Sequence, residues 1–274
     1  MSNILIYIRE RFPIIPVLLF AFGYAALATG TSINNKFQLI FIFAAIFSFF
    51  LLRQRVVDEF KDSYHDQKNF PDRPVPRGLI SKQQLIILGG IAMFFEWFFV
   101  YMAGVEALLA YIPVFLYSLL MAKEFFLPEW LNRHFNLYLL SHEVIFILFG
   151  LFFITVIKGS FVATNNPYLA LGVLLTAPFS IEIIRKFSPR YDKKGKPVQD
   201  TYSTVWGRNT ALSVLVLLLF LTALFLTLLK DSYHYLLFLL FSFFILLLFK
   251  SSDKAVKTIG AVIFLGLAVL ANIF

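Results

Sequence analysis

The chain has 274 residues, of which 59% are hydrophobic and only 15% are charged. Soluble domains are about half apolar and about a quarter charged, so this composition argues against a water-soluble globule. The absence of cysteine excludes a disulfide scaffold, a thiolate metal site and a thiol nucleophile, and the net charge of +8 first needs an explanation in terms of membrane topology.

Apolar runs of about 17–25 residues are needed to cross a bilayer, and we identify nine. They cover residues 14–34, 37–53, 82–104, 106–122, 136–158, 166–186, 209–229, 232–249 and 254–274. The runs are continuous and lack the alternation of a strand barrel. The sequence therefore predicts an all-α fold, a multi-pass transmembrane helical bundle of about nine spans, forming a single domain over residues 1–274.

The first run also has features of a signal peptide. Arg9 and Arg11 precede it, and Ala26-Leu27-Ala28 resembles a cleavage site. The run is long for a signal peptide and eight more apolar runs follow, so we favour a membrane span.

The basic residues predict the orientation of the bundle. With the N-terminus in the cytoplasm, 21 of the 24 Lys and Arg residues fall on the cytoplasmic side, and only Lys36, Lys158 and Lys230 fall outside. This satisfies the positive-inside rule, which accounts for the net charge and leaves no reason to invoke nucleic acid. We expect an integral protein of a bacterial inner membrane, in contact with membrane lipid, with the N-terminus and the site-bearing loops cytoplasmic.

The first long polar segment covers residues 54–81 and carries an acidic cluster. Asp58, Asp62 and Asp66 are spaced by four residues, and Glu59 adjoins the first of them. At helical spacing these carboxylates share one face and repel each other. A hard divalent cation would offset the repulsion, and Mg²⁺ commonly uses one or two carboxylates together with substrate phosphates.

A proline-rich stretch from Asn69 to Gly78 follows the acids. Its three prolines between 71 and 76 impose a stiff chain that carries Arg73 and Arg77. Two guanidinium groups beside a carboxylate cluster suit an anion held jointly by metal and arginine, and diphosphate is the simplest such anion. The alternative is a turn whose arginines face anionic lipid headgroups.

The second long polar segment covers residues 187–208 and falls on the same predicted side of the membrane. Long loops in a compact protein are usually functional or disordered. The alternative is that both segments are solvated loops that only set the topology.

The acidic motif resembles a known pattern. Asp58-Glu-x-x-Asp62-x-x-x-Asp66, followed by Arg73-Pro-Val-Pro-x-Gly78, is similar to the first aspartate-rich motif of the UbiA superfamily of intramembrane prenyltransferases. The stretch from Tyr117 to Lys123 is more weakly similar to the Tyr-rich stretch and basic residue that follow the fourth helix in that family. The resemblance implies a helical bundle around a central cavity, Mg²⁺, a prenyl diphosphate donor and a lipophilic acceptor.

The resemblance also implies roles for individual residues. Asp58 stands where the family has Asn and keeps an oxygen ligand. The expected metal ligands are Asp58, Glu59, Asp62 and Asp66, and the expected diphosphate-binding residues are Arg73 and Lys123.

The second motif departs from the family pattern. No Asp-x-x-x-Asp occurs after the sixth span. We expect Glu182, Asp192 or Asp200 to supply what it would have supplied, Asp192 as a metal ligand and Glu182 and Asp200 at the substrate. Arg185 and Lys186 would then meet diphosphate oxygens directly. The alternative is that Glu182 only pairs with these two cations along its helix.

Three ionisable residues lie inside predicted spans, where such residues are candidates for function. His142 is a candidate base toward an acceptor, and with Asp62 and Lys123 it completes the expected catalytic set. For His142 and Glu143 a helix–helix hydrogen bond is an equal alternative. Glu96 is interpreted as a packing partner or a cavity-wall residue rather than a ligand.

The leading hypothesis is therefore Mg²⁺-dependent prenyl transfer to a lipophilic acceptor. One alternative is a membrane terpene cyclase, which would ionise the same diphosphate without an acceptor. The other is a transporter or lipid-binding protein, which would need ionisable residues along a path through the membrane.

Overall fold

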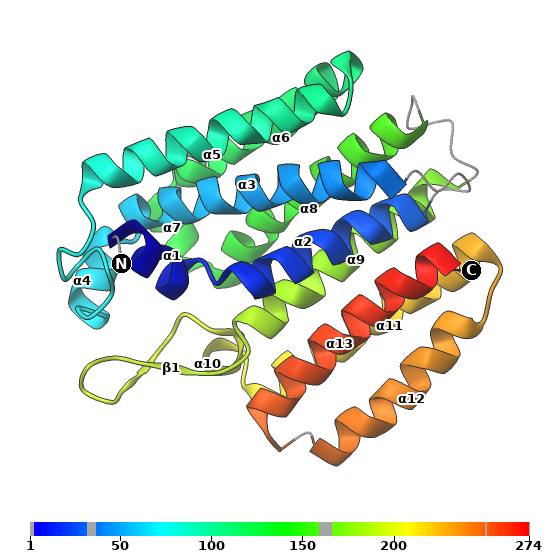
Figure 1. Ribbon diagram of the computed structural model, residues 1–274. Coiled ribbons are helices and arrows are strands. Elements are labelled where there is room, and N and C mark those ends of the chain that lie inside the picture. Colours follow the sequence, from blue (N-terminus) through cyan, green and yellow to red (C-terminus); the bar gives the residue numbers. More distant parts are fainter. Residues whose placement is uncertain (1–2, 32–36, 159–165, 250, 274) are drawn as a thin grey trace.

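A computed structural model describes residues 3–31, 37–158, 166–249 and 251–273 of the chain (Figure 1). Lys36, Lys250, Phe274 and the end of the first predicted span at residues 32–34 lie outside these ranges. The elements are α1 (Asn3–Arg11), α2 (Ile14–Gly30), α3 (Phe37–Lys61), α4 (Ser63–Asn69), α5 (Lys82–Met102), α6 (Val105–Ala122), the 3₁₀ turn η1 (Glu124–Phe126), α7 (Pro128–Arg133), α8 (Phe135–Lys158), α9 (Pro167–Arg185), β1 (Arg190–Tyr191), β2 (Pro197–Val198), α10 (Tyr202–Val205), α11 (Arg208–Lys230), α12 (His234–Phe249) and α13 (Asp253–Ile273).

Nine of these helices pack side by side in a closed ring (Figure 1). Successive neighbours around the ring are α2, α3, α5, α6, α8, α9, α11, α12 and α13, and α13 packs on α2 again. Further contacts of α2 with α8 and α9 cross the ring. The structure confirms the predicted all-α, multi-pass helical bundle.

Each predicted apolar run coincides with one of the nine helices, but they differ in length. Within the described ranges, seven helices are long and apolar enough to cross a membrane. α1 and α2 together pass the same test as an eighth span, although they meet at an angle of 55°. α12 has only 16 residues, fewer than the roughly 20 that a straight span requires. The chain is an integral membrane protein.

Helix ends follow local sequence signals. Ser81 and Gln84 form a reciprocal capping box at the start of α5, which satisfies backbone donors that a helix start leaves free. Gly207 precedes α11 with a φ of 85°, a conformation that glycine adopts without steric cost. Asp231 ends the same helix in the left-handed conformation, where Asp is tolerated.

Aromatic side chains fill the interior between α2, α3 and α8. Tyr24, Phe47 and Phe149 are fully buried, and the Phe47 ring meets those of Tyr24 and Phe149 at centroid distances of 5.0 and 5.1 Å. Aromatic pairs at such distances add to the stability that burial provides. Among the described residues, nine Phe side chains are buried inside the bundle and ten are exposed.

A buried ion pair joins α3 to α5. Arg53 Nε and Nη2 donate to the two carboxylate oxygens of Glu96 at 2.7 and 2.8 Å, and the Tyr111 hydroxyl donates to the same carboxylate at 2.7 Å. Arg53 and Glu96 are 6% and 0% exposed. The interpretation of Glu96 as a packing partner is confirmed, and this charge is sealed rather than placed along a path through the membrane.

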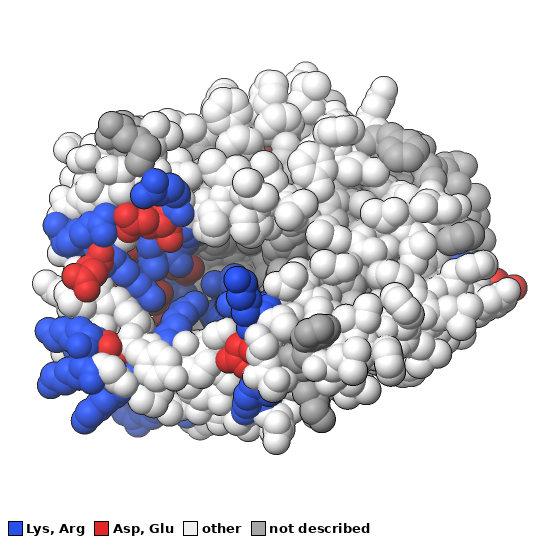
Figure 2. All heavy atoms as spheres, turned by 60° about the horizontal axis from the view of Figure 1, so that its bottom comes forward, with Lys and Arg blue, Asp and Glu red and all other residues white. Residues whose placement is uncertain are grey.

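The polar elements gather at one end of the ring (Figure 1). α1, α4, the β1–β2 hairpin and α10 all lie there, so the two long polar segments share one end, as the sequence predicted. Figure 2 shows Lys, Arg, Asp and Glu side chains around a hollow at this end, whereas most of the surface beside it is uncharged. Which side of the membrane this end faces stays a prediction.

Candidate functional site

The acidic motif lies on a nearly continuous helix formed by α3 and α4. The Asp62 amide donates to the Asp58 carbonyl, and the Asp66 amide donates to the Asp62 carbonyl, both at 2.8 Å. One carboxylate therefore follows another at each helical turn. This arrangement is the one that the four-residue spacing predicted.

Two acids of the motif are held by arginines, and we call Glu59 and Asp66 the pinned acids. Arg11 Nε lies 2.8 Å from Glu59 Oε1, and Arg11 Nη2 lies 3.2 Å from Asp66 Oδ2. Arg55 also pairs with Glu59 at 2.7 Å, and Arg73 pairs with the other oxygen of Asp66. The side chains of both acids are almost fully buried by these partners.

The partners of Asp66 determine its charge. Burial alone would raise the pKa of Asp66, but hydrogen bonds from His65 and Arg73 and the charges of Arg73 and Arg11 hold it well below its usual range. The hydrogen bond with Asp66 in turn raises the pKa of His65 above its ordinary value. Asp66 is a permanently ionised anchor for the proline-rich stretch, because Arg73 holds that stretch against α4.

The other two acids lack such partners, and we call Asp58 and Asp62 the open acids. Among the described residues, Asp58 forms one ion pair, with Arg55 at 4.0 Å, and 43% of its side chain is exposed. Asp62 forms no ion pair or side-chain hydrogen bond within the described residues. Burial and the nearby charges of Asp58 and Asp66 raise the pKa of Asp62. Negative charge is thus less compensated at the open acids than at the pinned acids.

The end of α9 carries a contrasting group, the α9 cluster of Glu182, Arg185, Lys186 and Tyr202. Glu182 accepts two hydrogen bonds from Arg185, at 2.8 and 2.9 Å. Lys186 lies 3.1 Å from Glu182, and the Tyr202 hydroxyl donates to it at 3.3 Å. This is the pairing that the sequence left open as the alternative for Glu182. More than half of the Arg185 side chain stays exposed.

Asp192 and Asp200 lie on the loop that contains the hairpin. Asp192 Oδ1 accepts hydrogen bonds from the Lys194 and Lys196 amides at 2.8 and 2.9 Å and so closes the turn between β1 and β2. Asp200 Oδ2 pairs with Arg190 at 3.1 Å, while its Oδ1 is buried with no partner among the described residues. The predicted roles of Asp192 in metal binding and of Asp200 in substrate binding stay predictions.

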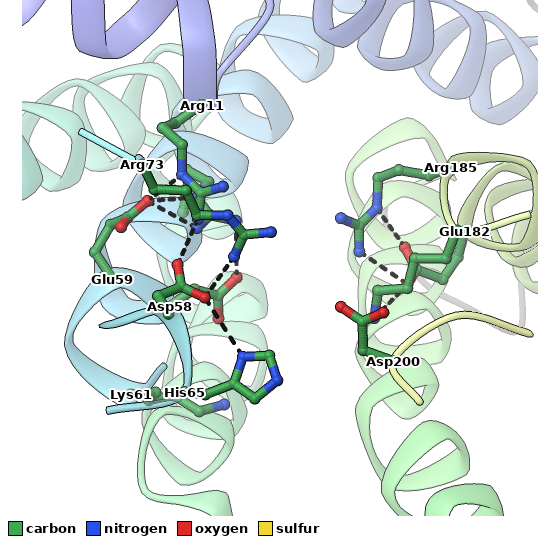
Figure 3. A network of polar contacts seen from close by, with 12 residues as sticks. Arg11, Asp58, Glu59, Lys61, His65, Arg73, Glu182, Arg185 and Asp200 are labelled. Atoms are coloured by element: carbon green, nitrogen blue, oxygen red, sulfur yellow. Dashed lines mark hydrogen bonds and ion pairs between the residues drawn. The ribbon is translucent and has the colours of Figure 1, made fainter. Parts of the chain in front are cut away.

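The acidic motif and the α9 cluster face each other across an open space (Figure 3). The charge of Asp58 acts on Arg185, and that of Asp200 acts on His65. Asp58, Asp62 and Glu182 all act electrostatically on the Tyr138 hydroxyl, which places the first turn of α8 between the two groups. We call the acidic motif and the α9 cluster the two walls of the site; in Figure 2, basic and acidic side chains lie intermingled around the hollow.

His142 lies on α8 one turn after Tyr138. Its Nδ1 lies 2.8 Å from the Tyr138 carbonyl oxygen, and its ring stacks on the Tyr138 ring at a centroid distance of 4.1 Å. A carbonyl only accepts, so Nδ1 donates to it, and Nε2 of the neutral ring is then an acceptor. Nε2 is buried and has no partner among the described residues.

A strained turn closes the space beside His142. Glu124, Phe125 and Phe126 in η1 have φ values of 46°, 53° and 61°, a left-handed conformation that is rare for residues other than glycine. The turn places the Phe125 ring edge-on to His142 at 5.8 Å and Glu124 at 3.5 Å from Lys61. Backbone strain of this kind clusters at functional sites.

Two predicted cations lie at the margin of the site. Lys123 directly follows α6, and its side chain is exposed. Arg77 pairs with Glu10 at 2.9 Å and donates to the Asp72 carbonyl at 2.8 Å, so it fastens the proline-rich stretch to α1. Their predicted roles toward diphosphate stay predictions.

A pocket of about 440 Å³ lies beside the pinned acids, between α1, the proline-rich stretch and the hairpin. Arg11, Arg73 and Lys193 line it together with Glu10 and Asp72. The pocket is lined by residues of both polar segments and lies next to the ion pairs that Arg11 and Arg73 form.

Sequence reasoning missed Arg11, Arg55 and Lys61 as parts of the site. Arg11 had counted only toward topology, and its partners are 48 and 55 residues away in the chain. Arg55 could have been found, because it precedes Glu59 by four residues and such pairs meet on one helical face.

The acidic motif offers a donor set for the Mg²⁺ that the resemblance implies. Among the described residues, no three His, Asp or Glu side chains form a ready-made metal cluster. The pinned acids already have cationic partners. The open acids offer two carboxylates with less compensated charge, which fits an ion that commonly takes one or two carboxylates and completes its shell with water and phosphate.

A family model matches most of the chain, and two solved structures share its fold. The family described as the UbiA prenyltransferase family matches residues 16–267. No curated protein sequence matches the chain. The apo structure of a UbiA homolog from Aeropyrum pernix K1 is similar with a TM-score of 0.58 and 13% identity, covering 94% of this chain and 98% of that one. A structure described as digeranylgeranylglyceryl phosphate synthase is similar with a TM-score of 0.53 and 17% identity, covering 100% and 98%.

Proposed function

The chain belongs to the UbiA prenyltransferase family, and we propose that it transfers a prenyl group from a prenyl diphosphate to a lipophilic acceptor within the membrane, with Mg²⁺ as cofactor. The observation that carries this proposal is the pair of facing walls at one end of the bundle. The open acids on one wall leave room for a cation, and the α9 cluster on the other presents Arg185 and Lys186 to an anion.

Asp58 and Asp62 are the residues that would hold Mg²⁺. Bound there, the ion would supply positive charge to the diphosphate oxygens as the bond to the prenyl carbon breaks. Arg11, Arg55 and Arg73 keep Glu59 and Asp66 in place, which fixes the helix that carries the open acids. The pinned acids thus support the site from behind rather than bind the metal.

Arg185 and Lys186 bind the diphosphate from the opposite wall. Charge-assisted hydrogen bonds from guanidinium and ammonium groups are strong and suit phosphate oxygens. Glu182 holds both cations through its own ion pairs and so orients them. These interactions stabilise the charge that develops on the leaving group.

The acceptor approaches from α8. His142 accepts a proton from the acceptor at its free Nε2, because Nδ1 is occupied by the Tyr138 carbonyl. The prenyl tail lies among the apolar side chains of the bundle.

The transporter alternative has less support than the transferase. It needs ionisable residues along a path through the membrane, and Glu96 is sealed in its ion pair with Arg53. A terpene cyclase would share the diphosphate site but would need no acceptor base, and the free nitrogen of His142 favours transfer.

The test is a product assay in lipid nanodiscs. The purified protein is incubated with Mg²⁺, a panel of prenyl diphosphates and a lipid extract, and diphosphate release and new lipid products are followed by mass spectrometry. We expect Mg²⁺-dependent diphosphate release with a prenylated lipid as product. Cyclised hydrocarbon without any prenylated lipid would identify a cyclase, and no release with any donor would contradict the proposal.

A further inference from the structure

Aromatic side chains close the interior of the ring beneath its polar end. The Phe50 and Phe149 rings meet edge-on at a centroid distance of 4.8 Å, and the Phe43 and Phe153 rings lie 4.4 Å apart. All four rings are at most 3% exposed. These pairs join α3 to α8, which are not successive neighbours around the ring. The contacts therefore cross the interior of the bundle rather than follow its wall.

A hydrogen bond closes the interior in a second direction. The hydroxyl of Tyr24 on α2 donates to the Leu174 carbonyl on α9 at 2.9 Å, and α2 and α9 are also not successive neighbours around the ring. Tyr24 is fully buried, and its ring meets that of Phe47 at 5.0 Å. We call Tyr24, Phe47, Phe50 and Phe149 the aromatic floor. Adding atoms to such a packed layer is unfavourable, because the side chains must leave their preferred positions.

The helices beside the aromatic floor approach each other through glycines. Gly23 precedes Tyr24 on α2, and a Cβ atom there would overlap the Phe264 ring of α13. Gly150 follows Phe149 on α8, and its Cβ atom would lie 2.7 Å from the Leu171 side chain of α9. Any side chain at these two positions would push the neighbouring helix away. The α2–α13 and α8–α9 contacts are therefore tight at the level of the aromatic floor.

The aromatic floor lies at a similar depth below both walls of the site. Phe50 precedes the open acid Asp58 by eight residues on α3, and Leu174 precedes Glu182 by eight residues on α9. At a rise of about 1.5 Å per residue, eight residues correspond to roughly 12 Å along each helix. An apolar tail that starts between the walls therefore has about this distance before it meets the aromatic floor.

This depth restricts the length of a prenyl tail. An isoprene unit contributes four main-chain bonds, against the three of a peptide residue, so it spans roughly 4.5 Å when extended. Two units then span roughly 9 Å, three roughly 14 Å and four roughly 18 Å. A tail of two units fits above the aromatic floor and a tail of three reaches it, whereas a tail of four has to displace its rings.

We infer that the donor is a short prenyl diphosphate, geranyl or farnesyl diphosphate, and that Phe50 and Phe149 set the upper limit of its length. This inference rests on the proposed function and adds the chain length of the donor. The end of a short tail buries its apolar surface against the two rings, which is favourable. A longer tail loses this fit, because it must separate rings that are packed across the interior.

Equilibrium binding tests the inference without turnover. The probes are the S-thiolodiphosphate analogues of geranyl, farnesyl and geranylgeranyl diphosphate, in which sulfur replaces the bridging oxygen and the bond to the prenyl carbon resists cleavage. Binding to the full chain in nanodiscs with Mg²⁺ is measured by isothermal titration, with empty nanodiscs as the correction for partition into lipid. We expect the geranyl and farnesyl analogues to bind at least tenfold more tightly than the geranylgeranyl analogue.

Variants of the aromatic floor locate the limit. Phe50→Ala removes one ring, and we expect it to bind the geranylgeranyl analogue at least tenfold more tightly than the wild type does. Phe149→Leu removes the partner ring with a smaller loss of volume and should shift the same affinity in the same direction, by about threefold. This milder variant keeps the test decisive should Phe50→Ala fold poorly. Phe41→Ala makes the same substitution on α3 at a ring that is 65% exposed, and it should keep the wild-type selectivity.

Each result decides the inference. Equal or tighter binding of the geranylgeranyl analogue to the wild type would overturn it, because the tail would then pass the aromatic floor or leave the bundle between helices. Wild-type selectivity in both floor variants would overturn it as well. Absence of Mg²⁺-dependent binding of all three analogues to the wild type would contradict the proposed function, and the inference would fall with it.

Discussion

The acidic motif and the α9 cluster use ion pairs in opposite ways. In the acidic motif, Arg11, Arg55 and Arg73 pair closely with Glu59 and Asp66, and the open acids keep at most the 4.0 Å contact between Arg55 and Asp58 among the described residues. In the α9 cluster, one glutamate holds two cations, and Arg185 remains more than half exposed. The acidic motif therefore retains negative charge, and the α9 cluster retains positive charge. Together the two groups can hold a cation and an anion between them.

The comparison also separates two kinds of acidic residue that are alike in sequence. Glu59 and Asp66 are buried and closely paired, whereas Asp58 is 43% exposed with one long contact, to Arg55 at 4.0 Å, and Asp62 has no ion pair among the described residues. We expect substitutions at the first kind to act on stability and substitutions at the second kind to act on metal and substrate. The following predictions test this division, in order of decreasing effect.

Asp62→Asn should cause the largest loss. It removes the charge of one of the two open acids, so the metal stabilises the leaving group less well. We expect the activation free energy to rise by about 3 kcal/mol, which lowers the rate of diphosphate release about a hundredfold. Release is measured with Mg²⁺ at limiting concentration. Asp231→Asn, at an exposed left-handed residue between α11 and α12, is the matched control and should keep the full rate. An unchanged rate in Asp62→Asn would remove the distinction between open and pinned acids.

Glu59→Gln should act on stability instead. It removes the charged partner that Arg11 and Arg55 share and leaves them only the longer contacts with Asp66 and Asp58. Breaking buried pairs in this way lowers the free energy of unfolding by about 3 kcal/mol. Thermal unfolding in detergent measures the effect as a lower Tm. The affinity for Mg²⁺ in the presence of diphosphate should change less than twofold, and a large loss of affinity at unchanged Tm would identify Glu59 as a ligand.

Arg185→Gln should weaken binding of the prenyl diphosphate. Loss of one charge-assisted hydrogen bond raises its Kd by about tenfold. Lys194→Gln, at the exposed tip of the hairpin, removes the same charge at the same end of the bundle and should change the Kd less than twofold. Equal effects of the two substitutions would mean that the α9 cluster acts only through net charge.

Asp192→Asn should have the smallest effect. The asparagine oxygen can accept the same two hydrogen bonds from the Lys194 and Lys196 amides, so the hairpin turn is kept. We expect less than a twofold change in the Mg²⁺ concentration that gives half-maximal diphosphate release. A tenfold increase in that concentration would instead support Asp192 as a metal ligand.

The sequence predicted those parts of the fold and site that depend on local spacing. The turn-by-turn order of Asp58, Asp62 and Asp66 followed from helical periodicity, as did the pairing of Glu182 with Arg185 and Lys186 as an alternative. The apolar runs predicted the ring helices because their signal is continuous. α12 shows the limit of this signal, since an apolar run of about the right length forms a helix of 16 residues.

Long-range pairing could not be predicted in the same way. Arg11 meets Glu59 and Asp66 only because α1 bends back over the acidic motif, and one basic residue in an N-terminal segment does not indicate its partner. The left-handed turn at Phe125 carries no glycine to mark it. The free Nε2 of His142 depends on which ring nitrogen meets the Tyr138 carbonyl, which is a matter of side-chain orientation.

Binding of Mn²⁺ in place of Mg²⁺ tests the central claim most directly. Electron paramagnetic resonance is recorded on the wild type, on Asp58→Asn/Asp62→Asn and on Glu59→Gln, each with inorganic diphosphate. We predict Mn²⁺ bound together with diphosphate in the wild type and in Glu59→Gln, and loss of that bound signal in the double variant. A bound signal that survives in the double variant but disappears in Glu59→Gln would contradict the assignment of the open acids as the metal ligands.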